Sequence, residues 1–342
     1  MEAKKNRSIK VAIIGMGLIG QERLSAVKKL SDKGRKIEVC GIYDPYCEKK
    51  AEIEKKFKIE FLDDLDSVYD HSPNWVLIAV PHDRAFELVK LFLKKGFNVL
   101  VEKPLGRTLK EAEILLNCVV RAGQLWVGFN YRFFDGIAMA LEDISKGKFG
   151  KIISVNMVLG HGCYPQIKKT WKLDPKKSGG GCLIDPGIHL LDLCRIISRD
   201  KLKIKNGVKW SGFWKTGIEE ECHFLFEAGS FLINLQLSIV RWRSTFRIEI
   251  NGQDGYGIVS GRGKSYGNQT YIYGPRWGWQ DNPSQKDSER LINETTGEDV
   301  FAKELEALFF PESRSFIKPC SALEAVENMR ILEKCRAAID LK

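Results

Sequence analysis

KVAIIGMGLIG, residues 10–20, carries a short apolar run straight into a glycine-rich loop. The run 10–14 is nearly all apolar, as expected for a parallel strand covered on both faces. The loop holds Gly15, Gly17 and Gly20 in the spacing G-x-G-x-x-G. A helical pattern follows, with apolar residues at Leu24, Val27 and Leu30. The stretch therefore predicts strand, tight turn and helix in that order.

Glycine has a steric reason at each of the three positions. Gly15 permits the tight turn, Gly17 lets a pyrophosphate approach the backbone, and Gly20 lets the helix pack close to the strand. The N–H groups at the helix start, including those of Leu18 and Ile19, favour phosphate. The spacing alone is a weak signal, but between a buried strand and a helix it predicts a dinucleotide site.

Asp44 follows the second predicted strand, 38–43, where a carboxylate typically binds the adenosine ribose. It would repel a 2′-phosphate, and the following Pro45 and Tyr46 supply no group to receive one. The pattern therefore favours NAD over NADP. The alternative is that Asp44 only forms the turn before Pro45.

Strands and helices continue to alternate through the first 130 residues. We expect strands at 74–79, 98–101 and 125–129 and helices at 48–57, 84–95 and 109–122. This order predicts a doubly wound parallel sheet, which binds ligands beyond the carboxyl ends of its strands. The candidate cofactor contacts at these strand ends are Ala79, Pro81, His82, Glu102, Lys103 and Arg132.

The remaining chain has a different texture. After a predicted helix at 135–146, apolar residues alternate with polar ones in 231–239 and again in 246–250. This period of two predicts antiparallel strands with one covered face. A final amphipathic helix is expected at 321–341. We therefore predict a Rossmann domain over 1–130 and an α+β domain with a large open, mainly antiparallel sheet over 131–342.

Composition limits the function classes. Of the 342 residues, 44% are hydrophobic and 29% charged, and no apolar run approaches a membrane span. No signal-peptide pattern is evident and the nine cysteines lack metal-like spacing, so we expect a cytoplasmic protein with reduced thiols. The net charge of +10 is dispersed, which argues against nucleic-acid binding. A local basic cluster at 168–177 is either a solvated loop or an attraction for an anionic substrate.

Three polar residues recur at helical spacing in the second half. Asp185, His189 and Asp192 are at i, i+4 and i+7, which would put them on one helical face among apolar neighbours. Buried polar groups without partners are costly, so this pattern indicates a site. A metal site formed with His161 is an alternative, but no typical zinc spacing supports it.

Two motifs carry a family resemblance. The segment Glu102-Lys103-Pro104 resembles the "EKP" segment of the glucose–fructose oxidoreductase/inositol dehydrogenase (Gfo/Idh/MocA) family. GGGCLIDPGIHLLD, residues 179–192, is similar to the family signature GGG-x-x-x-D-x-G-x-H-x-x-D. With the glycine loop these motifs span most of the chain. The resemblance implies an NAD-dependent dehydrogenase without a metal, assembled as a homodimer or homotetramer.

The resemblance also implies roles for individual residues. His189 is expected to be the general acid/base, Lys103 to stabilise alkoxide charge, and Asp185 to orient the site. Glu102 is expected to place the nicotinamide ribose, and Asp192 to contact substrate. The Lys103–Pro104 bond is expected to be cis.

The substrate class is less specified. His161, Trp171, Lys172 and Arg132 suit a polyhydroxylated ligand, and neighbouring segments resemble a sugar-pathway subgroup. Trp171 is equally well explained as a core residue. The leading hypothesis is a sugar or nucleotide-sugar substrate. The alternatives are an inositol or cyclitol dehydrogenase and a non-catalytic NAD-binding protein.

Overall fold

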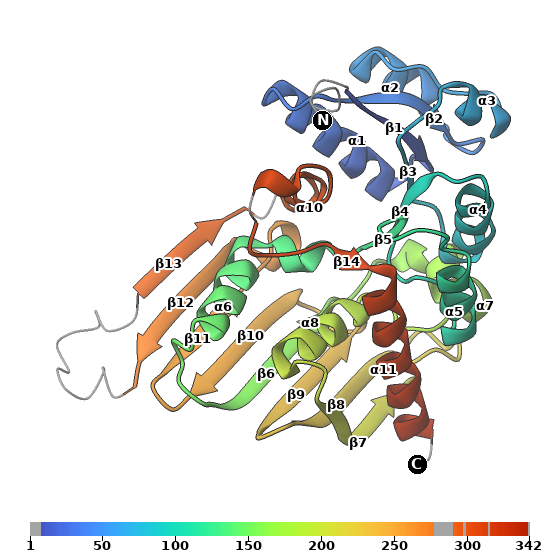
Figure 1. Ribbon diagram of the computed structural model, residues 1–342. Helices are drawn as coiled ribbons and strands as arrows, with labels where there is room; N and C mark the ends of the chain where they lie inside the picture. The colour runs from blue at the N-terminus through green and yellow to red at the C-terminus, as the bar shows by residue number, and fades with distance from the viewer. Residues whose placement is uncertain (1–7, 277–289, 297–298, 314, 341–342) are drawn as a thin grey trace. The chain divides into compact units, whose positions relative to one another are not determined.

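The computed structural model describes residues 8–276, 290–296, 299–313 and 315–340. They form two compact units, each described here by itself (Figure 1). The first unit contains the described residues up to Asn130 together with Phe301–Val326. The second contains Tyr131–Val300 and the described residues from Glu327 onward. The sequence-based division assigned 301–326 to the second domain, and the structure differs at this segment.

The first unit is built on a six-stranded sheet in the order β14-β5-β4-β3-β1-β2. Strands β1 to β5 pair in parallel, and β14 is antiparallel to β5. This confirms the predicted doubly wound sheet. The strands are β1 (Ile9–Ile14), β2 (Ile37–Tyr43), β3 (Trp75–Ile78), β4 (Asn98–Glu102), β5 (Leu125–Gly128) and β14 (Cys320–Ser321). The helices are α1 (Leu18–Asp32), α2 (Lys50–Phe57), α3 (Asp66–Asp70), α4 (His82–Lys94), α5 (Leu109–Asn117), α10 (Val300–Phe309) and the 3-10 turn η6 (Pro311–Ser313).

The strand order reverses at β1. This strand pairs with β2 on one side and with β3 on the other. In doubly wound sheets, ligands bind beyond the carboxyl ends of the strands at this reversal. The loops that follow Ile14 and Ile78 are therefore the candidate ligand loops of the first unit.

The segment 301–326 joins the first unit because its apolar residues complete that unit's core. Ala302, Leu305 and Phe309 are buried in one cluster with residues of β1 and α1. Cys320 then pairs with Val127 at the edge of the sheet. These are contacts between distant parts of the chain, so neither hydrophobic periodicity nor composition reveals them.

Helix α5 ends at Asn117, earlier than the predicted 122. The side chain of Gln124 accepts a hydrogen bond from the backbone N–H of Val120 at 2.9 Å, which replaces the next helical bond. The same amide donates to the carbonyl oxygens of Leu93 and Phe97. Gln124 is fully buried, so these bonds stabilise the turn that leads into β5.

The second unit is built on an eight-stranded sheet in the order β13-β12-β11-β10-β6-β9-β8-β7. Only β6 and β9 pair in parallel among the described strands, so the sheet is mainly antiparallel, as predicted. The strands are β6 (Ile152–Gly160), β7 (Leu202–Trp210), β8 (Glu221–Ala228), β9 (Phe231–Ser238), β10 (Thr245–Gly252), β11 (Gly255–Ser260), β12 (Gln269–Pro275) and β13 (Arg290–Thr295). The helices are α6 (Asp135–Ser145), α7 (Pro175–Ser178), α8 (Ile188–Ser198) and α11 (Ala322–Asp340), with 3-10 turns η1 (Asn130–Phe133), η2 (Pro165–Lys169), η3 (Trp171–Leu173) and η4 (Lys264–Tyr266).

Helices α6 and α8 lie on one face of this sheet (Figure 1). The alternation in β9 follows from this cover, since Ile233, Leu235 and Leu237 are buried. Leu232, pointing to the other face, is 46% exposed. Helix α11 closes the chain close to the predicted 321–341, although Leu341 lies outside the described residues. Within the described residues, every helix falls short of the length and apolarity that a membrane crossing requires.

Candidate functional site

The glycine loop shows two kinds of glycine. Gly15 has a φ of +90°, and a Cβ there would lie 2.5 Å from the carbonyl oxygen of Ala79. A Cβ at Gly20 would lie 2.0 Å from the carbonyl oxygen of Gly15. At Gly17, by contrast, no protein atom lies within 4 Å of the position of a Cβ. Gly15 and Gly20 serve close packing, and Gly17 leaves an open approach to the backbone.

That open approach lies at a helix start. Gly17 is the N-cap of α1, and Leu18, the first helical residue, is 70% exposed. The N–H groups of Leu18 and Ile19 lie in the first turn, where no helical acceptor exists. No acidic residue occupies this turn to compete for them. The residues present therefore fit a dinucleotide's pyrophosphate.

Asp44 anchors the glycine loop to the end of β2. Its Oδ2 accepts a hydrogen bond from the backbone N–H of Met16 at 2.7 Å. Its Oδ1 accepts one from the N–H of Tyr46 at 2.9 Å. Asp44 thus forms the turn, as the alternative interpretation held. The half-buried carboxylate group lies beside the loop, which is compatible with a ribose contact.

Arg84 is a residue that sequence reasoning missed. Its guanidinium carbon lies 4.2 Å from the ring centroid of Tyr46, a cation–π contact, and its side chain is exposed. Arg84 is on α4, far from Tyr46 in sequence, so no local signal could have paired them. A cation therefore lies near the end of β2 after all, which weakens the argument for NAD that rested on its absence.

The residues that follow β3 lie beside the glycine loop. Ala79 donates its N–H to the carbonyl of Ile14 at 2.8 Å, which holds the end of β3 beside the glycine loop. Pro81 is the N-cap of α4, and His82 is its first residue. His82 is only 7% exposed. Cofactor contact by these residues remains a prediction.

Glu102 does not present a free carboxylate. Its Oε1 accepts a hydrogen bond from Nε of the buried Arg23 at 2.7 Å and forms an ion pair with it. Arg23 also pairs with Glu304, at 2.7 Å. Glu102 thus has a structural role as a partner of the buried guanidinium. Its expected contact with the nicotinamide ribose stays a prediction. Lys103 follows it directly, and the Lys103–Pro104 bond is cis, as expected.

The triple glycine in the second unit is a packing device. A Cβ at Gly181 would lie 1.9 Å from the carbonyl oxygen of Glu219. The next residue, Cys182, donates its N–H to that same oxygen at 2.8 Å. The turn places Asp185 before α8, which begins only at Ile188. The prediction that Asp185 shares a helical face with His189 and Asp192 is therefore wrong, because Pro186 and Gly187 hold a separate turn.

His189 is clamped by an aromatic ring. Its imidazole stacks on the phenol of Tyr131, with centroids 3.8 Å apart and planes inclined by 7°. Tyr131 is itself packed edge-on against Phe134 and Phe246. His189 is 4% exposed. This packing fixes the ring plane of His189, as a proton-transfer group requires.

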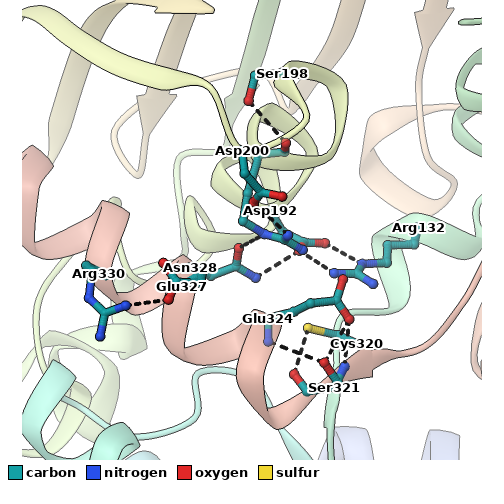
Figure 2. Close-up of polar contacts among 11 residues, drawn as sticks. Arg132, Asp192, Ser198, Asp200, Cys320, Ser321, Glu324, Glu327, Asn328 and Arg330 are labelled. Carbon is teal, nitrogen blue, oxygen red and sulfur yellow. Dashed lines mark hydrogen bonds and ion pairs between the residues drawn. The ribbon is translucent and has the colours of Figure 1, made fainter.

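Asp192 lies in a buried network rather than at a substrate surface (Figure 2). Its two oxygens accept from Nε and a terminal nitrogen of Arg132, each at 2.6 Å. Asn328 donates to the same carboxylate at 2.8 Å, and Nε of Arg195 donates to Asn328 at 2.9 Å. Asp192 is 1% and Arg132 3% exposed. The structure therefore gives Asp192 and Arg132 a structural pairing. Substrate contact by Asp192 and cofactor or substrate contact by Arg132 stay predictions.

Asp185 instead faces Lys172. The lysine ammonium lies 3.1 Å from Oδ2 of Asp185, and the charge of Asp185 raises the pKa of Lys172. The ammonium also lies 5.8 Å from the ring centroid of Trp171. Trp171 begins η3 and is half-buried, so it is neither a pure core residue nor an open stacking platform.

His161 belongs to the same neighbourhood. Its Nδ1 accepts a hydrogen bond from the backbone N–H of Cys163 at 3.2 Å. Burial lowers the pKa of His161; Asp185 opposes this, and Lys172 and Arg262 reinforce it. A neutral imidazole with Nδ1 as acceptor carries its proton on Nε2. Burial raises the pKa of Cys163 to about 11, so its sulfur is a thiol.

Sequence reasoning also missed the aromatic and cationic neighbours of His189. Tyr131 adjoins the predicted Arg132. Arg262 lies in GRGKSYG, residues 261–267, one of the segments that resemble the sugar-pathway subgroup, but the resemblance does not single out Arg262. Arg262 stacks near Tyr131. The sequence alone does not indicate that this tyrosine and this arginine are neighbours of His189 in space. Within the described part of the chain, no group of three or more His, Cys, Asp or Glu side chains could hold a metal ion.

Comparison with known families agrees with this architecture. Residues 9–129 match the model described as "Oxidoreductase family, NAD-binding Rossmann fold", and residues 137–257 match the "GFO/IDH/MocA C-terminal domain". The fold and these two matches define an oxidoreductase with a Rossmann nucleotide-binding domain. The chain belongs to the Gfo/Idh/MocA family.

Individual relatives are more distant. Glucose-6-phosphate 3-dehydrogenase of Bacillus subtilis (strain 168) is 29% identical over 187 residues, 54% of this chain and 52% of the relative. The chain thus spans about half the length of the curated relatives it matches. A levoglucosan dehydrogenase in complex with NADH superposes with a TM-score of 0.81 at 18% identity, covering 98% of this chain and 97% of the other. A 3-ketoreductase from Actinomadura kijaniata with NADP and TDP-benzene gives 0.78 at 16%, covering 97% and 98%.

Proposed function

We propose that this chain is an NAD-dependent dehydrogenase that transfers a hydride between nicotinamide and a hydroxyl carbon of a sugar or nucleotide sugar. The observation that carries the proposal is the clamp on His189, because a buried, orientation-fixed imidazole is what a proton-transfer step requires. The relatives include dehydrogenases of glucose 6-phosphate and levoglucosan, which supports a carbohydrate substrate.

The first unit would hold the cofactor. The open side of Gly17 and the first-turn N–H groups of α1 suit the pyrophosphate, and Asp44 suits the ribose hydroxyls. Arg84 is the competing observation, since an exposed guanidinium beside Tyr46 would attract a 2′-phosphate. We favour NAD because Asp44 is fixed by two hydrogen bonds, whereas Arg84 is exposed.

Cofactor choice is tested with two variants. Asp44→Asn keeps a side-chain acceptor but removes the charge, and it should raise kcat/KM for NADP relative to NAD. Arg84→Ala should change kcat/KM for NAD little. A wild-type enzyme that prefers NADP and loses that preference in Arg84→Ala would overturn the choice of NAD.

The chemistry assigns one task to each polar residue. When bound, the nicotinamide supplies the acceptor for the carbinol hydride. His189 takes the hydroxyl proton, with its ring plane held by Tyr131. Lys103 donates a hydrogen bond to the same oxygen and stabilises its negative charge. Asp185, paired with Lys172, positions the polar groups that bind the substrate.

His161 and Trp171 complete the proposed substrate contacts. A neutral His161 would donate from Nε2 to a sugar hydroxyl, because its Nδ1 is already an acceptor. The half-buried face of Trp171 would pack against the apolar face of a sugar ring. Both contacts would suit a cyclitol equally well, so sugars and cyclitols have to be distinguished by measuring turnover of each.

The oligomeric state and the cellular location of the protein are also part of the proposal. We infer a homodimer or homotetramer through the uncovered face of the second sheet, where Val208 and Leu232 are about half exposed, at 47% and 46%. Light scattering should give at least a dimer, and Leu232→Arg should lower the mass. A monomeric wild type would overturn this point. The nine free cysteines suit the reducing cytoplasm.

The test of the function is turnover. Purified protein is assayed for reduction of NAD, with NADP in parallel, against free sugars, sugar phosphates, nucleotide sugars and cyclitols. We expect activity on at least one sugar or nucleotide sugar. Activity confined to cyclitols would establish the alternative substrate class, and NAD binding without any turnover would indicate a non-catalytic protein.

A further inference from the structure

Arg262 lies in a tightly constrained loop between β11 and η4. Gly261 has a φ of +72°, and a Cβ there would lie 2.1 Å from the carbonyl oxygen of Asn268. Gly263 donates its N–H to the carbonyl of Gly267 at 2.6 Å, which closes the loop. The backbone on both sides of Arg262 is therefore fixed, and so is the root of its side chain.

The guanidinium of Arg262 is held by aromatic rings. Its central carbon lies 3.9 Å from the ring centroid of Tyr266 and 5.1 Å from that of Tyr131. The ring of Tyr131 also stacks on the imidazole of His189, and the two ring centroids are 3.8 Å apart. Stacking on these rings orients the planar guanidinium. The proposed acid/base and this cation therefore share one aromatic neighbour.

Arg262 also lacks what an enclosed arginine normally has. Its Nε is shielded from solvent and makes no hydrogen bond within the described residues. No carboxylate among those residues lies within ion-pair distance of it, whereas Arg23, Arg132 and Arg195 each have one. The guanidinium stays charged at any pH the protein experiences, so the missing counter-ion is a cost to the folded chain.

The local charge balance indicates what would supply that counter-ion. Asp185 is the nearby carboxylate, and Lys172 already pairs with it at 3.1 Å. His161 is neutral, since burial lowers its pKa. The charge of Asp185 raises the pKa of both Lys172 and Arg262, so the two cations share this carboxylate and one positive charge remains in excess.

We propose that Arg262 binds an oxyanion carried by the substrate sugar itself, a carboxylate or a phosphate, and so makes the enzyme selective for anionic sugars. The inference rests on the proposed function and narrows its substrate class. A planar guanidinium suits the paired oxygens of either anion. Neutral sugars would leave the charge unpaired and would bind less well.

The test compares three probes: glucose, glucuronate and glucose 6-phosphate. Each is assayed with wild type, with Arg262→Gln and Arg262→Lys, and with the control Arg243→Gln, which removes an exposed charge of the same unit. We expect kcat/KM to favour one of the two anionic sugars over glucose by at least about tenfold. Arg262→Gln should lower kcat/KM for that sugar about 10- to 100-fold, mainly through KM, and should lower kcat/KM for glucose much less.

The two substitutions at Arg262 separate the effect of its charge from the effect of its planar shape. Arg262→Lys should fall between wild type and Arg262→Gln, since lysine restores the charge but not the planar fork. Arg243→Gln should match wild type. The phosphate and carboxylate arms identify which anion the site takes. An equal loss for glucose and for the anionic sugars in Arg262→Gln would overturn the proposal, as would lost NAD affinity with sugar kinetics unchanged.

A binding measurement without NAD keeps this proposal distinct from the proposed function. Calorimetric titration of glucuronate and of glucose 6-phosphate into wild type should show binding by one of them, and Arg262→Gln should abolish it. That result with no turnover of any sugar would reject the dehydrogenase and retain the anion site. Equal binding by wild type and Arg262→Gln, or no binding by either, would reject the anion site.

Discussion

The imidazole of His189 lies flat on the phenol ring of Tyr131, 3.8 Å from it and within 7° of parallel. The two residues come from different elements, α8 and η1, and Tyr131 is held by further aromatic contacts. Stacking fixes the plane in which the imidazole nitrogens lie. In our account Tyr131 is a positioning residue for the proton transfer by His189.

Replacing Tyr131 should separate positioning from binding. Tyr131→Phe keeps the stack and should behave nearly as wild type. Tyr131→Leu loses it, and kcat should fall about 10- to 100-fold with little change in KM, because misplacement of a reacting group is costly. Steady-state kinetics on the best substrate of the panel measure both values. Equal kcat values for the Phe and Leu variants would remove the positioning role.

Gly17 and Gly20 form a matched pair for the cofactor site. Gly17→Ala adds a methyl group where no protein atom lies within 4 Å, so folding should be unaffected and NAD affinity should drop by about tenfold or more. Gly20→Ala puts the methyl group 2.0 Å from the carbonyl oxygen of Gly15, so stability should fall by about 1–3 kcal/mol. Denaturant titration and fluorescence titration with NADH distinguish the two. Unchanged NADH affinity in Gly17→Ala would contradict the proposed pyrophosphate position.

Asp192 is expected to act on stability and not on substrate affinity. Asp192→Asn leaves Arg132 and Arg195 buried beside a neutral partner, and the free energy of unfolding should fall by about 3–5 kcal/mol. Asp200 provides the control, because it pairs with Arg195 but is 66% exposed. Asp200→Asn should change stability little. A stable Asp192→Asn protein with a raised substrate KM would restore the substrate contact expected from sequence.

His161 should titrate below the ordinary histidine value of 6.5. Because its folded pKa is lowered, its contribution to stability is complete above the unfolded pKa and is lost as pH falls through the folded pKa. Acidification below pH 6.5 should therefore destabilise wild type more than His161→Gln. NMR titration of the imidazole gives the pKa directly. A value at or above 6.5 would contradict both the burial argument and the assignment of a neutral His161 at pH 7.

The sequence predicts the sheets well because their signals are local. The apolar run before Gly15 and the alternation in β9 each report burial within a few residues, and the structure has both elements. Residues 301–326 belong to the first unit because Leu305 and Phe309 pack against core residues that are far away in the sequence. Such long-range contacts cannot be predicted from a short stretch of sequence.

The difference between local signals and long-range contacts also explains which features of the candidate site follow from the sequence. Residues defined by backbone position, such as Gly17 and the cis Lys103–Pro104 bond, follow from motifs. Roles that depend on a side chain's partner do not. Asp192 pairs with Arg132, and Glu102 pairs with Arg23, across wide sequence separations, so the motifs do not reveal these structural roles of the two carboxylates.

The central claim is that His189 and Lys103 carry out the chemistry on a cofactor held by the glycine loop. The most direct measurement is NADH formation by wild type, His189→Ala and Lys103→Ala on the best substrate of the panel, with NADH binding measured on the same preparations. We predict that both variants bind NADH as wild type does and lose turnover by at least about 100-fold. Full turnover in either variant would contradict the assigned roles.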